Sequence, residues 1–196
     1  MPVLWDKKKG CIVSNESSEI IRMFNSAFDE VGAAGGDYYP QSLHAQIDEV
    51  NERIYTTLNN GVYRCGFATT QEAYEDAVGK LCATMDWLEE KLSRQRYLAG
   101  SQITEADWRL FTTLLQFDPV YVGHFKCNIR RLVDYPNLWA YTRDLYQHDG
   151  VAQTINMSHI KRHYYVSHST INPSGVVPAG PEMDLLSEHD RENLGA

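Results

Sequence analysis

The chain has 196 residues, of which 43% are hydrophobic and 22% charged, a composition typical of a globular protein. Its formal charge of -8 at pH 7 argues against nucleic acid or anionic lipid as a partner, because both bind basic surfaces. No apolar run is long enough to span a membrane, and the first residues lack the charged-then-apolar order of a signal peptide.

The first part of the chain, residues 1–30, predicts two strands followed by a helix. Two short apolar runs around a polar, glycine-containing turn are typical of a β-hairpin. Asn15 is the expected cap of a helix that begins at Glu16, with apolar residues at helical spacing behind it. Two strands are rarely stable alone, so this segment is expected to need a partner surface. Residues 31–41, rich in Gly, Ala and Tyr, predict a linker.

Helical periodicity dominates residues 42–170. A first long helix is expected to end at Asn59-Asn60-Gly61, with the glycine in a left-handed cap. Thr69 and Glu72 form the capping box that predicts the next helix.

The most specific local signal is the start of a third helix. Thr104 is the expected N-cap, and Asp107 can accept a hydrogen bond from the N-cap amide. Ile103 and Trp108 flank the cap as a hydrophobic staple. This helix is apolar nearly all round, so we expect it at the centre of the domain and ending at Pro119.

Two more helices are predicted, over residues 136–146 and 151–163. Three prolines and two glycines then interrupt the pattern. Residues 171–196 therefore predict an irregular tail, charged and mobile at its end.

This order, a strand–strand–helix segment followed by helices around a buried one opened by Thr-x-x-Asp, resembles the glutathione transferase superfamily. Longer strings narrow the resemblance to the glutathionyl-hydroquinone reductases, the Xi class of that superfamily. The strings are Asn60–Tyr63, Gly66–Ala68, Arg96–Leu98, Thr104–Asp107, His124–Asn128, Asp134–Leu138 and His159–Tyr165.

The resemblance covers nearly the whole chain and implies a mainly α fold. A glutathione transferase C-terminal helical domain would occupy residues 42–170. A partial thioredoxin-like, glutathione-binding segment would precede it at residues 1–30. Family members are longer, and their chemistry uses a cysteine in a Cys-Pro-Trp-Ala stretch that these 196 residues do not contain. We therefore expect the nucleophilic cysteine upstream and little turnover by the chain as it stands.

The resemblance also implies glutathione-binding residues. Pro2 matches the superfamily's cis-proline, whose preceding residue, here Met1, pairs with the cysteine of glutathione. Glu16 and Ser17 match the site for the γ-glutamyl group. The physics agrees, because a helix amino terminus offers free N–H groups and a positive dipole end to a carboxylate.

Tyr63 and Tyr164 match the family's active-site tyrosines and are expected to contact the aromatic substrate. Their phenolic hydroxyls could hold the quinone oxygens and stabilise negative charge on them. A tyrosine with an unperturbed pKa of about 10 remains a donor at neutral pH. Tyr165 is adjacent, and a shared role for it stays open.

A cysteine and three histidines could also have functional roles, but each has a simpler structural interpretation. Cys65 lies close to Tyr63 and is a possible substitute nucleophile, although a buried, inert thiol is the favoured interpretation. His159 and His163, with His168 nearby, are spaced to share a metal, but no carboxylate completes the set. We therefore expect no metal. The four widely spaced cysteines favour reduced thiols in the cytoplasm.

The function expected from the resemblance is the glutathione-dependent reduction of S-glutathionyl-hydroquinones to hydroquinones. Glutathione would be the co-substrate, quinone-type small molecules the ligands, and a homodimer the assembly. Two alternatives remain. One is a dimerising domain that binds aromatic ligands without catalysis. The other is a general glutathione transferase that conjugates electrophiles, which would need a Tyr or Ser beside the glutathione thiol.

Overall fold

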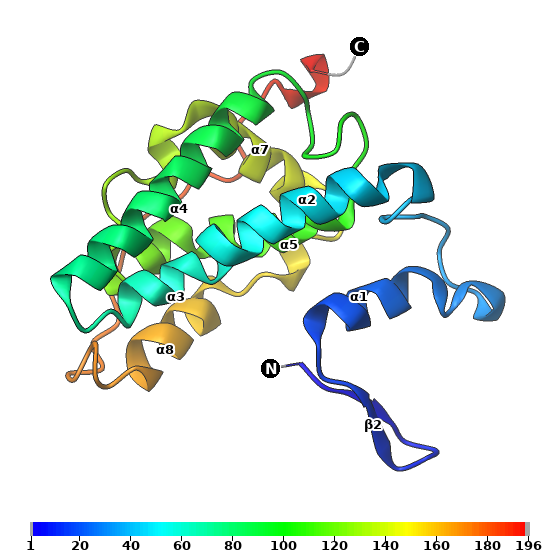
Figure 1. Ribbon diagram of the computed structural model, residues 1–196, viewed down its shortest axis with the longest axis horizontal. Helices are drawn as coiled ribbons and strands as arrows, with labels where there is room; N and C mark the ends of the chain where they lie inside the picture. Colours follow the sequence, from blue (N-terminus) through cyan, green and yellow to red (C-terminus); the bar gives the residue numbers. More distant parts are fainter. Residues whose placement is uncertain (1, 195–196) are drawn as a thin grey trace.

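The computed structural model describes residues 2–194, which form a small hairpin, one helix beside it and a bundle of helices (Figure 1). The first part contains β1 (Leu4–Asp6), β2 (Cys11–Ser14) and α1 (Ser17–Ser26). The bundle contains α2 (His44–Ile54), α3 (Gly61–Gly66), α4 (Gln71–Leu92), α5 (Glu105–Gln116), α6 (Val122–His124), α7 (Pro136–Gln147) and α8 (Met157–Ser167). No helix among these residues combines the length and the apolar character needed to cross a membrane. The mainly α fold with a small strand–strand–helix segment is confirmed.

The predicted hairpin is present. Strands β1 and β2 pair antiparallel, with Trp5 opposite Ile12. Asp6 closes the turn, because its carboxylate accepts from the backbone N–H groups of Lys8 and Lys9 at 2.8 and 2.9 Å. The helix that follows begins one residue later than expected, with Glu16 rather than Asn15 as the residue before its first turn.

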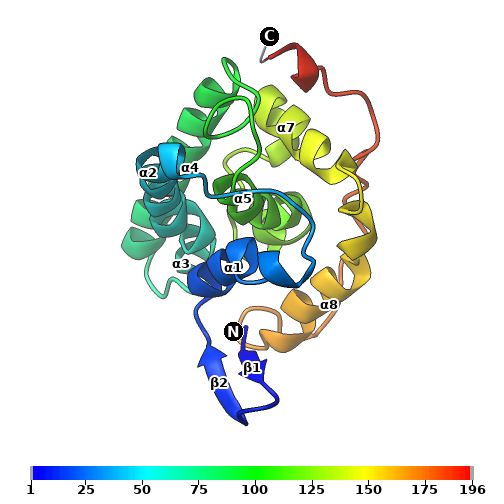
Figure 2. The same cartoon turned by 90° about the vertical axis from the view of Figure 1, so that its right-hand side faces the viewer.

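Helix α1 and the hairpin lie to one side of the bundle, and Figure 2 shows α1 below α5, with the segment between α1 and α2 passing in front of α5. Arg22 on α1 is the main polar link between the two parts. Its guanidinium contacts Asp48 of α2 at 2.6 Å and Glu105 of α5 at 3.0 Å. Glu105 is buried and also accepts from the Asn51 amide at 3.0 Å. This network fixes the first turn of α5 beside α1.

Helix α5 is the central helix, as predicted. Both the backbone N–H and the hydroxyl of Thr104 donate to the Asp107 carboxylate, at 2.7 and 2.9 Å. The other carboxylate oxygen accepts from the Leu98 N–H at 2.9 Å and the Tyr141 hydroxyl at 2.8 Å. Asp107 therefore also connects α5 to α7, through Tyr141, and to the loop before α5, through Leu98. These contacts explain why Thr104 and Asp107 are fully buried.

Two predicted helix ends are wrong for the same physical reason. The helical path does not end at Asn59-Asn60-Gly61, because a π-helical turn, Tyr55–Asn59, connects α2 to α3. Gly61 is the first residue of α3 and has no left-handed backbone. A second π turn, Phe117–Tyr121, contains Pro119 and connects α5 to α6. The wider turn tolerates a residue without an N–H, so this proline does not terminate the helical path.

Two helix starts also differ from the prediction. Helix α4 is capped by Thr70, whose hydroxyl accepts from the Ala73 N–H at 3.2 Å, one residue beyond the predicted Thr69. The predicted helix over residues 151–163 is instead a 3-10 turn, Ala152–Thr154, followed by α8. Asn156 separates them, since its side chain accepts from the His159 N–H at 3.0 Å and so caps a new helix.

The last described residues, 171–194, contain one short 3-10 turn, Arg191–Asn193, which is anchored to the bundle. Arg191 is only 1% exposed. Its guanidinium donates to the carbonyl oxygens of Leu92, Gln95 and Arg96 at 2.6, 2.6 and 2.7 Å. These carbonyls lie at and beyond the carboxyl end of α4, where a cation is favoured by the helix dipole. Arg191 therefore packs against the bundle, within a stretch whose composition predicts a mobile end.

Candidate functional site

A cavity of about 690 Å³ lies between α1, the α2–α3 junction, α5 and α8. It brings together residues from both ends of the chain. Its walls are mostly apolar and aromatic, with a few polar groups, as in small-molecule sites generally. The lining includes Ser17, Ile21, Phe24, Asn25, Tyr38, Tyr55, Tyr63, Glu105, Trp108, Arg109, Gln116, Tyr121 and Tyr164.

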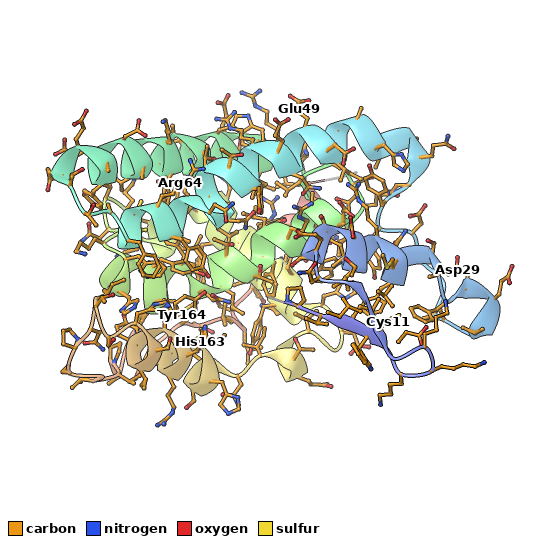
Figure 3. The ribbon with its side chains drawn as sticks, turned by 60° about the horizontal axis from the view of Figure 1, so that its bottom comes forward. Cys11, Asp29, Glu49, Arg64, His163 and Tyr164 are labelled. Carbon is orange, nitrogen blue, oxygen red and sulfur yellow. The ribbon has the colours of Figure 1, made fainter. Side chains whose placement is uncertain are left out.

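The two tyrosines expected to contact the aromatic substrate meet in this cavity. Tyr63 comes from α3 and Tyr164 from α8, and their hydroxyl oxygens are 2.7 Å apart. Figure 3 shows Tyr164 on the side of α8 that faces the rest of the bundle. Tyr63 is 38% exposed and Tyr164 only 6%. The structure therefore joins two residues separated by 101 positions, with Tyr63 more open to a ligand.

Two residues that the sequence did not single out complete this group. The Tyr121 hydroxyl lies 2.9 Å from that of Tyr164 and donates to Oε1 of Gln116 at 2.7 Å. The Tyr164 hydroxyl also contacts Oε1 of Gln116, at 2.8 Å. We refer to Tyr63, Tyr121, Tyr164 and Gln116 as the tyrosine cluster. No sequence pattern marks Gln116 and Tyr121, because they reach Tyr164 only through the packing of α8 beside the π turn that contains Pro119.

Burial fixes the protonation of the inner phenols. It raises the pKa of Tyr121 far above its ordinary value, and the neighbouring Tyr164 adds to the effect. It also raises the pKa of Tyr164. Both groups are therefore neutral near pH 7 and act as hydrogen-bond donors.

The ring of Phe125 supports the cluster from behind. It is fully buried and stacks on Tyr121, with centroids 5.6 Å apart and planes 13° apart. Its centroid is 5.4 Å from that of Tyr63. Gly66 leaves the space for this ring, because a Cβ built there would lie 2.1 Å from Cδ1 of Phe125. The glycine is thus a packing requirement of the site.

Of the described residues expected to bind glutathione, Glu16 and Ser17 lie at the start of α1, and Pro2 lies beside the hairpin. Ser17 is the first residue of α1 and lines the cavity, while Glu16 is exposed just before it. No side chain among the described residues caps this helix. The Glu19 N–H donates to the Glu16 carbonyl oxygen at 3.1 Å, which leaves the N–H groups of Ser17 and Ser18 available to an anionic ligand. Pro2 is exposed near the hairpin. Met1, and with it the Met1–Pro2 bond, lies outside the described residues.

Comparisons with known proteins bear on this arrangement. Residues 71–144 match the family described as the C-terminal domain of glutathione S-transferases. The chain is 58% identical over 192 residues to the glutathionyl-hydroquinone reductase YqjG of Escherichia coli, covering 98% of this chain and 58% of the relative. The chain is homologous to the Xi-class glutathione transferases.

Solved structures of this class agree with the fold. The glutathione-bound structure of E. coli YqjG superposes with a TM-score of 0.96, covering 98% of this chain and 62% of that one. A Xi-class structure from Natrialba magadii superposes with a TM-score of 0.97 at 47% sequence identity, covering 99% of this chain and 59% of that one. The chain thus spans about three fifths of the length of these relatives, and its likeness to the Xi class, inferred from short strings, is confirmed.

Cys65 lies away from the cavity that holds the tyrosine cluster. Its thiol is buried and lines a separate cavity of about 330 Å³ with Tyr74 and Lys126. A hydrogen bond from the Cys127 thiol lowers the pKa of Cys65. The structure therefore does not bring this cysteine to the tyrosine cluster, where a substitute nucleophile would be needed.

The histidines that the sequence spacing suggested for a metal do not share one site, since the ring centroids of His163 and His168 are 6.4 Å apart. His159 is exposed, whereas Nε2 of His124 lies 3.1 Å from Nδ1 of His168. Among residues 2–194, no group of three or more His, Cys, Asp or Glu side chains is arranged to hold a metal. Tyr165 points away from the cluster, with its hydroxyl 3.5 Å from the carbonyl oxygen of Pro119.

Proposed function

We propose that this chain forms the hydroquinone-binding part, and a portion of the glutathione-binding part, of a glutathione-dependent reductase of S-glutathionyl-hydroquinones. One observation carries the proposal. A single cavity connects the open first turn of α1, at Ser17, with the paired hydroxyls of Tyr63 and Tyr164. A ligand that joins glutathione to an aromatic diol has the same two ends. Similarity to the reductase YqjG, whose solved structure contains bound glutathione, supports this assignment.

The proposed chemistry exchanges one sulfur bond for another. A thiolate attacks the glutathione sulfur of the substrate, forming a disulfide as the sulfur–aryl bond breaks. The bonding electrons leave with the ring, which takes up a proton to become the hydroquinone. A second glutathione then reduces the mixed disulfide. The phenols of this chain would hold the ring oxygens and stabilise negative charge on them.

At the glutathione end, we propose that the γ-glutamyl carboxylate binds the first turn of α1. The Ser17 hydroxyl and the free N–H groups there are donors, and the helix dipole favours an anion. The Glu16 carboxylate would then pair with the ammonium group. Glu19 is already engaged, since it accepts from the buried Ser14 hydroxyl at 2.7 Å.

Equilibrium binding tests the proposal without requiring turnover. We would measure, by calorimetry, the affinity of the chain for glutathione, for menadiol, and for S-glutathionyl-menadiol. Ser17→Ala is expected to weaken the binding of both glutathione-containing ligands by about tenfold or more, the contribution of one hydrogen bond to a charged group. Tyr63→Phe is expected to weaken only the two ligands that carry the ring. Ser18→Ala, one residue beyond Ser17, is the matched control.

Other outcomes would favour the alternatives. Binding of menadiol without any binding of glutathione would support a domain for aromatic ligands. Binding of both ligands with no gain for the joined one would contradict a shared cavity. Release of menadiol from S-glutathionyl-menadiol in excess glutathione, lost in Cys65→Ala, would make this chain a catalyst that uses Cys65.

We also propose a homodimer in the cytoplasm. The four cysteines are free thiols, as a reducing compartment requires. The dimer is proposed from the resemblance to the Xi class. Sedimentation equilibrium tests it, and a mass equal to one chain across the concentration range would contradict it.

A further inference from the structure

The tyrosine cluster has fewer protons than hydrogen-bond contacts. Its contacts are Tyr63 with Tyr164, Tyr121 with Tyr164, and each of Tyr121 and Tyr164 with Oε1 of Gln116. The three phenols supply one proton each, and an amide oxygen only accepts. All four contacts therefore cannot be hydrogen bonds at once. The placement of three protons decides what the cluster offers to the cavity.

Two arrangements of these protons matter for a ligand. In the inward arrangement, Tyr164 and Tyr121 donate to Gln116, and Tyr63 donates to Tyr164. The cavity then meets only lone pairs on the Tyr63 oxygen. In the outward arrangement, Tyr164 donates to Tyr63, and Tyr121 donates to Gln116. The Tyr63 proton is then free to point into the cavity. The two differ only by rotation of hydroxyl groups, with no movement of other atoms.

We infer that Tyr121 and Gln116 are positioning residues that set the direction of the Tyr63 hydroxyl, so that one site can either donate to a phenolate or quinone oxygen or accept from a hydroquinone hydroxyl. The inference rests on the proposed function, in which the ring oxygen lies beside Tyr63. Exposure supports this division of roles. Tyr63 is 38% exposed, whereas Tyr121 and Tyr164 are 3% and 6% exposed.

The role of Tyr121 follows from competition for the Tyr164 proton. A carbonyl oxygen is a better acceptor than a phenol oxygen, so Gln116 draws that proton inward. When Tyr121 already donates to the same Oε1, at 2.7 Å, this pull is weaker and Tyr164 can donate to Tyr63. Gln116 and Tyr121 therefore act in opposite directions. Gln116 favours the inward arrangement, and Tyr121 favours the outward one.

Two nearly isosteric substitutions test this opposition. In Tyr121→Phe, Gln116 loses one donor and holds the Tyr164 proton, so the Tyr164 oxygen becomes an acceptor that draws the Tyr63 proton inward. In Gln116→Met the acceptor is gone, and Tyr164 can donate outward to Tyr63. In the double variant the acceptor is also absent, so it should behave like Gln116→Met alone. A role in packing alone would produce no such masking of one substitution by the other.

The probe is 4-nitrophenol, whose phenol and phenolate forms differ in colour, so that the ratio of bound phenolate to bound phenol can be read by absorbance. Compared with the wild-type chain, this ratio should fall about tenfold in Tyr121→Phe and rise about tenfold in Gln116→Met, as expected for one hydrogen bond to a charged oxygen. The charged groups in the cavity, Glu105 and Arg109, and the titratable groups beside Tyr164, His163 and His168, are the same in all variants.

Binding of 4-nitroanisole, which has no hydroxyl, is the control and should be equal in all four proteins. Equal phenolate-to-phenol ratios in the four proteins, with the control unchanged, would overturn the inference. So would a double variant that behaves like Tyr121→Phe. Failure of the wild-type chain to bind either compound would overturn the proposed function and this inference together, an outcome distinct from binding without a change in ratio.

Discussion

Replacing Gly66 by alanine has two opposite effects on the free energy of unfolding, a gain in helix propensity and a clash with the ring of Phe125. Gly66 lies at the end of α3, where alanine would gain up to about 1 kcal/mol from helix propensity. The added Cβ, however, would lie 2.1, 2.3 and 2.7 Å from three ring atoms of Phe125. No carbon atom sits that close to another without bonding, so the ring or the helix must move. Phe125 has little freedom, because it is fully buried and stacked on Tyr121.

The net effect is therefore destabilisation. Overpacking of a buried site costs about 1–3 kcal/mol, and contacts this short place Gly66→Ala at the upper end. Subtracting the propensity gain leaves about 2 kcal/mol, or a fall in Tm of about 4–8 °C for a chain of this size. Thermal and urea unfolding would measure it. The ring would also shift against Tyr63, so the affinity for 4-nitrophenol should fall.

Gly79→Ala is the matched control. Gly79 lies in the middle of α4, is exposed, and has no heavy atom within 4 Å of an added Cβ. This substitution should stabilise the chain by about 0.5–1 kcal/mol. In a Phe125→Ala background, Gly66→Ala should cost less than it does alone, because the Cγ, Cδ1 and Cε1 atoms that clash with the added Cβ are gone. Equal stabilisation by both glycine substitutions would refute the argument from the Phe125 ring.

Three further changes have expected outcomes. Arg191→Met should lower the free energy of unfolding by about 2–3 kcal/mol in urea, because three carbonyl oxygens lose a buried charged donor. Arg22→Met should leave Glu105 short of a partner and speed proteolysis within residues 31–41 several-fold, as α1 undocks more often. Burial lowers the pKa of His124, so the unfolded chain binds more protons near pH 6. Stability should therefore fall as the pH drops through about 6.5, less steeply in His124→Asn.

Each of these has a result that would count against it. Arg94→Ala removes an exposed ion pair with Glu90 and should lower the free energy of unfolding by at most about 0.5 kcal/mol. If Arg191→Met lowers it by no more than Arg94→Ala does, Arg191 does not stabilise the fold. Unchanged cleavage in Arg22→Met would show that apolar contacts alone hold α1. A midpoint in urea that does not vary between pH 7.5 and 5.5 would contradict the lowered pKa of His124.

The features that the sequence predicted well are those determined locally. Thr104 and Asp107 are three residues apart, and the capping geometry depends on little else. The hairpin likewise depends on a short turn. The helix ends at Gly61 and Pro119 were missed because tertiary packing favours π turns there. Residue preferences alone gave no sign of this.

The site shows a similar division. Tyr63 and Tyr164 were named through a family resemblance, and the structure adds that their hydroxyls touch. Gln116 and Tyr121 carry no motif, since their contact with Tyr164 depends on how α5 and α8 pack. Arg191 lies in a charged stretch that is typical of a solvated end, yet it is buried. A buried arginine held by backbone carbonyls has no sequence signature.

The two π turns have a consequence for how this site could arise or be lost. Each adds about one residue to an otherwise continuous helical path, and one residue turns an α-helix by about 100°. Tyr63 follows the first turn, and Tyr121 closes the second. Deleting one residue from the first turn would allow α2 and α3 to join as a regular helix. It would also rotate Tyr63 out of line with Tyr164. A single-codon deletion could thus leave a folded bundle without its paired hydroxyls, and a single-codon insertion could have created the pair.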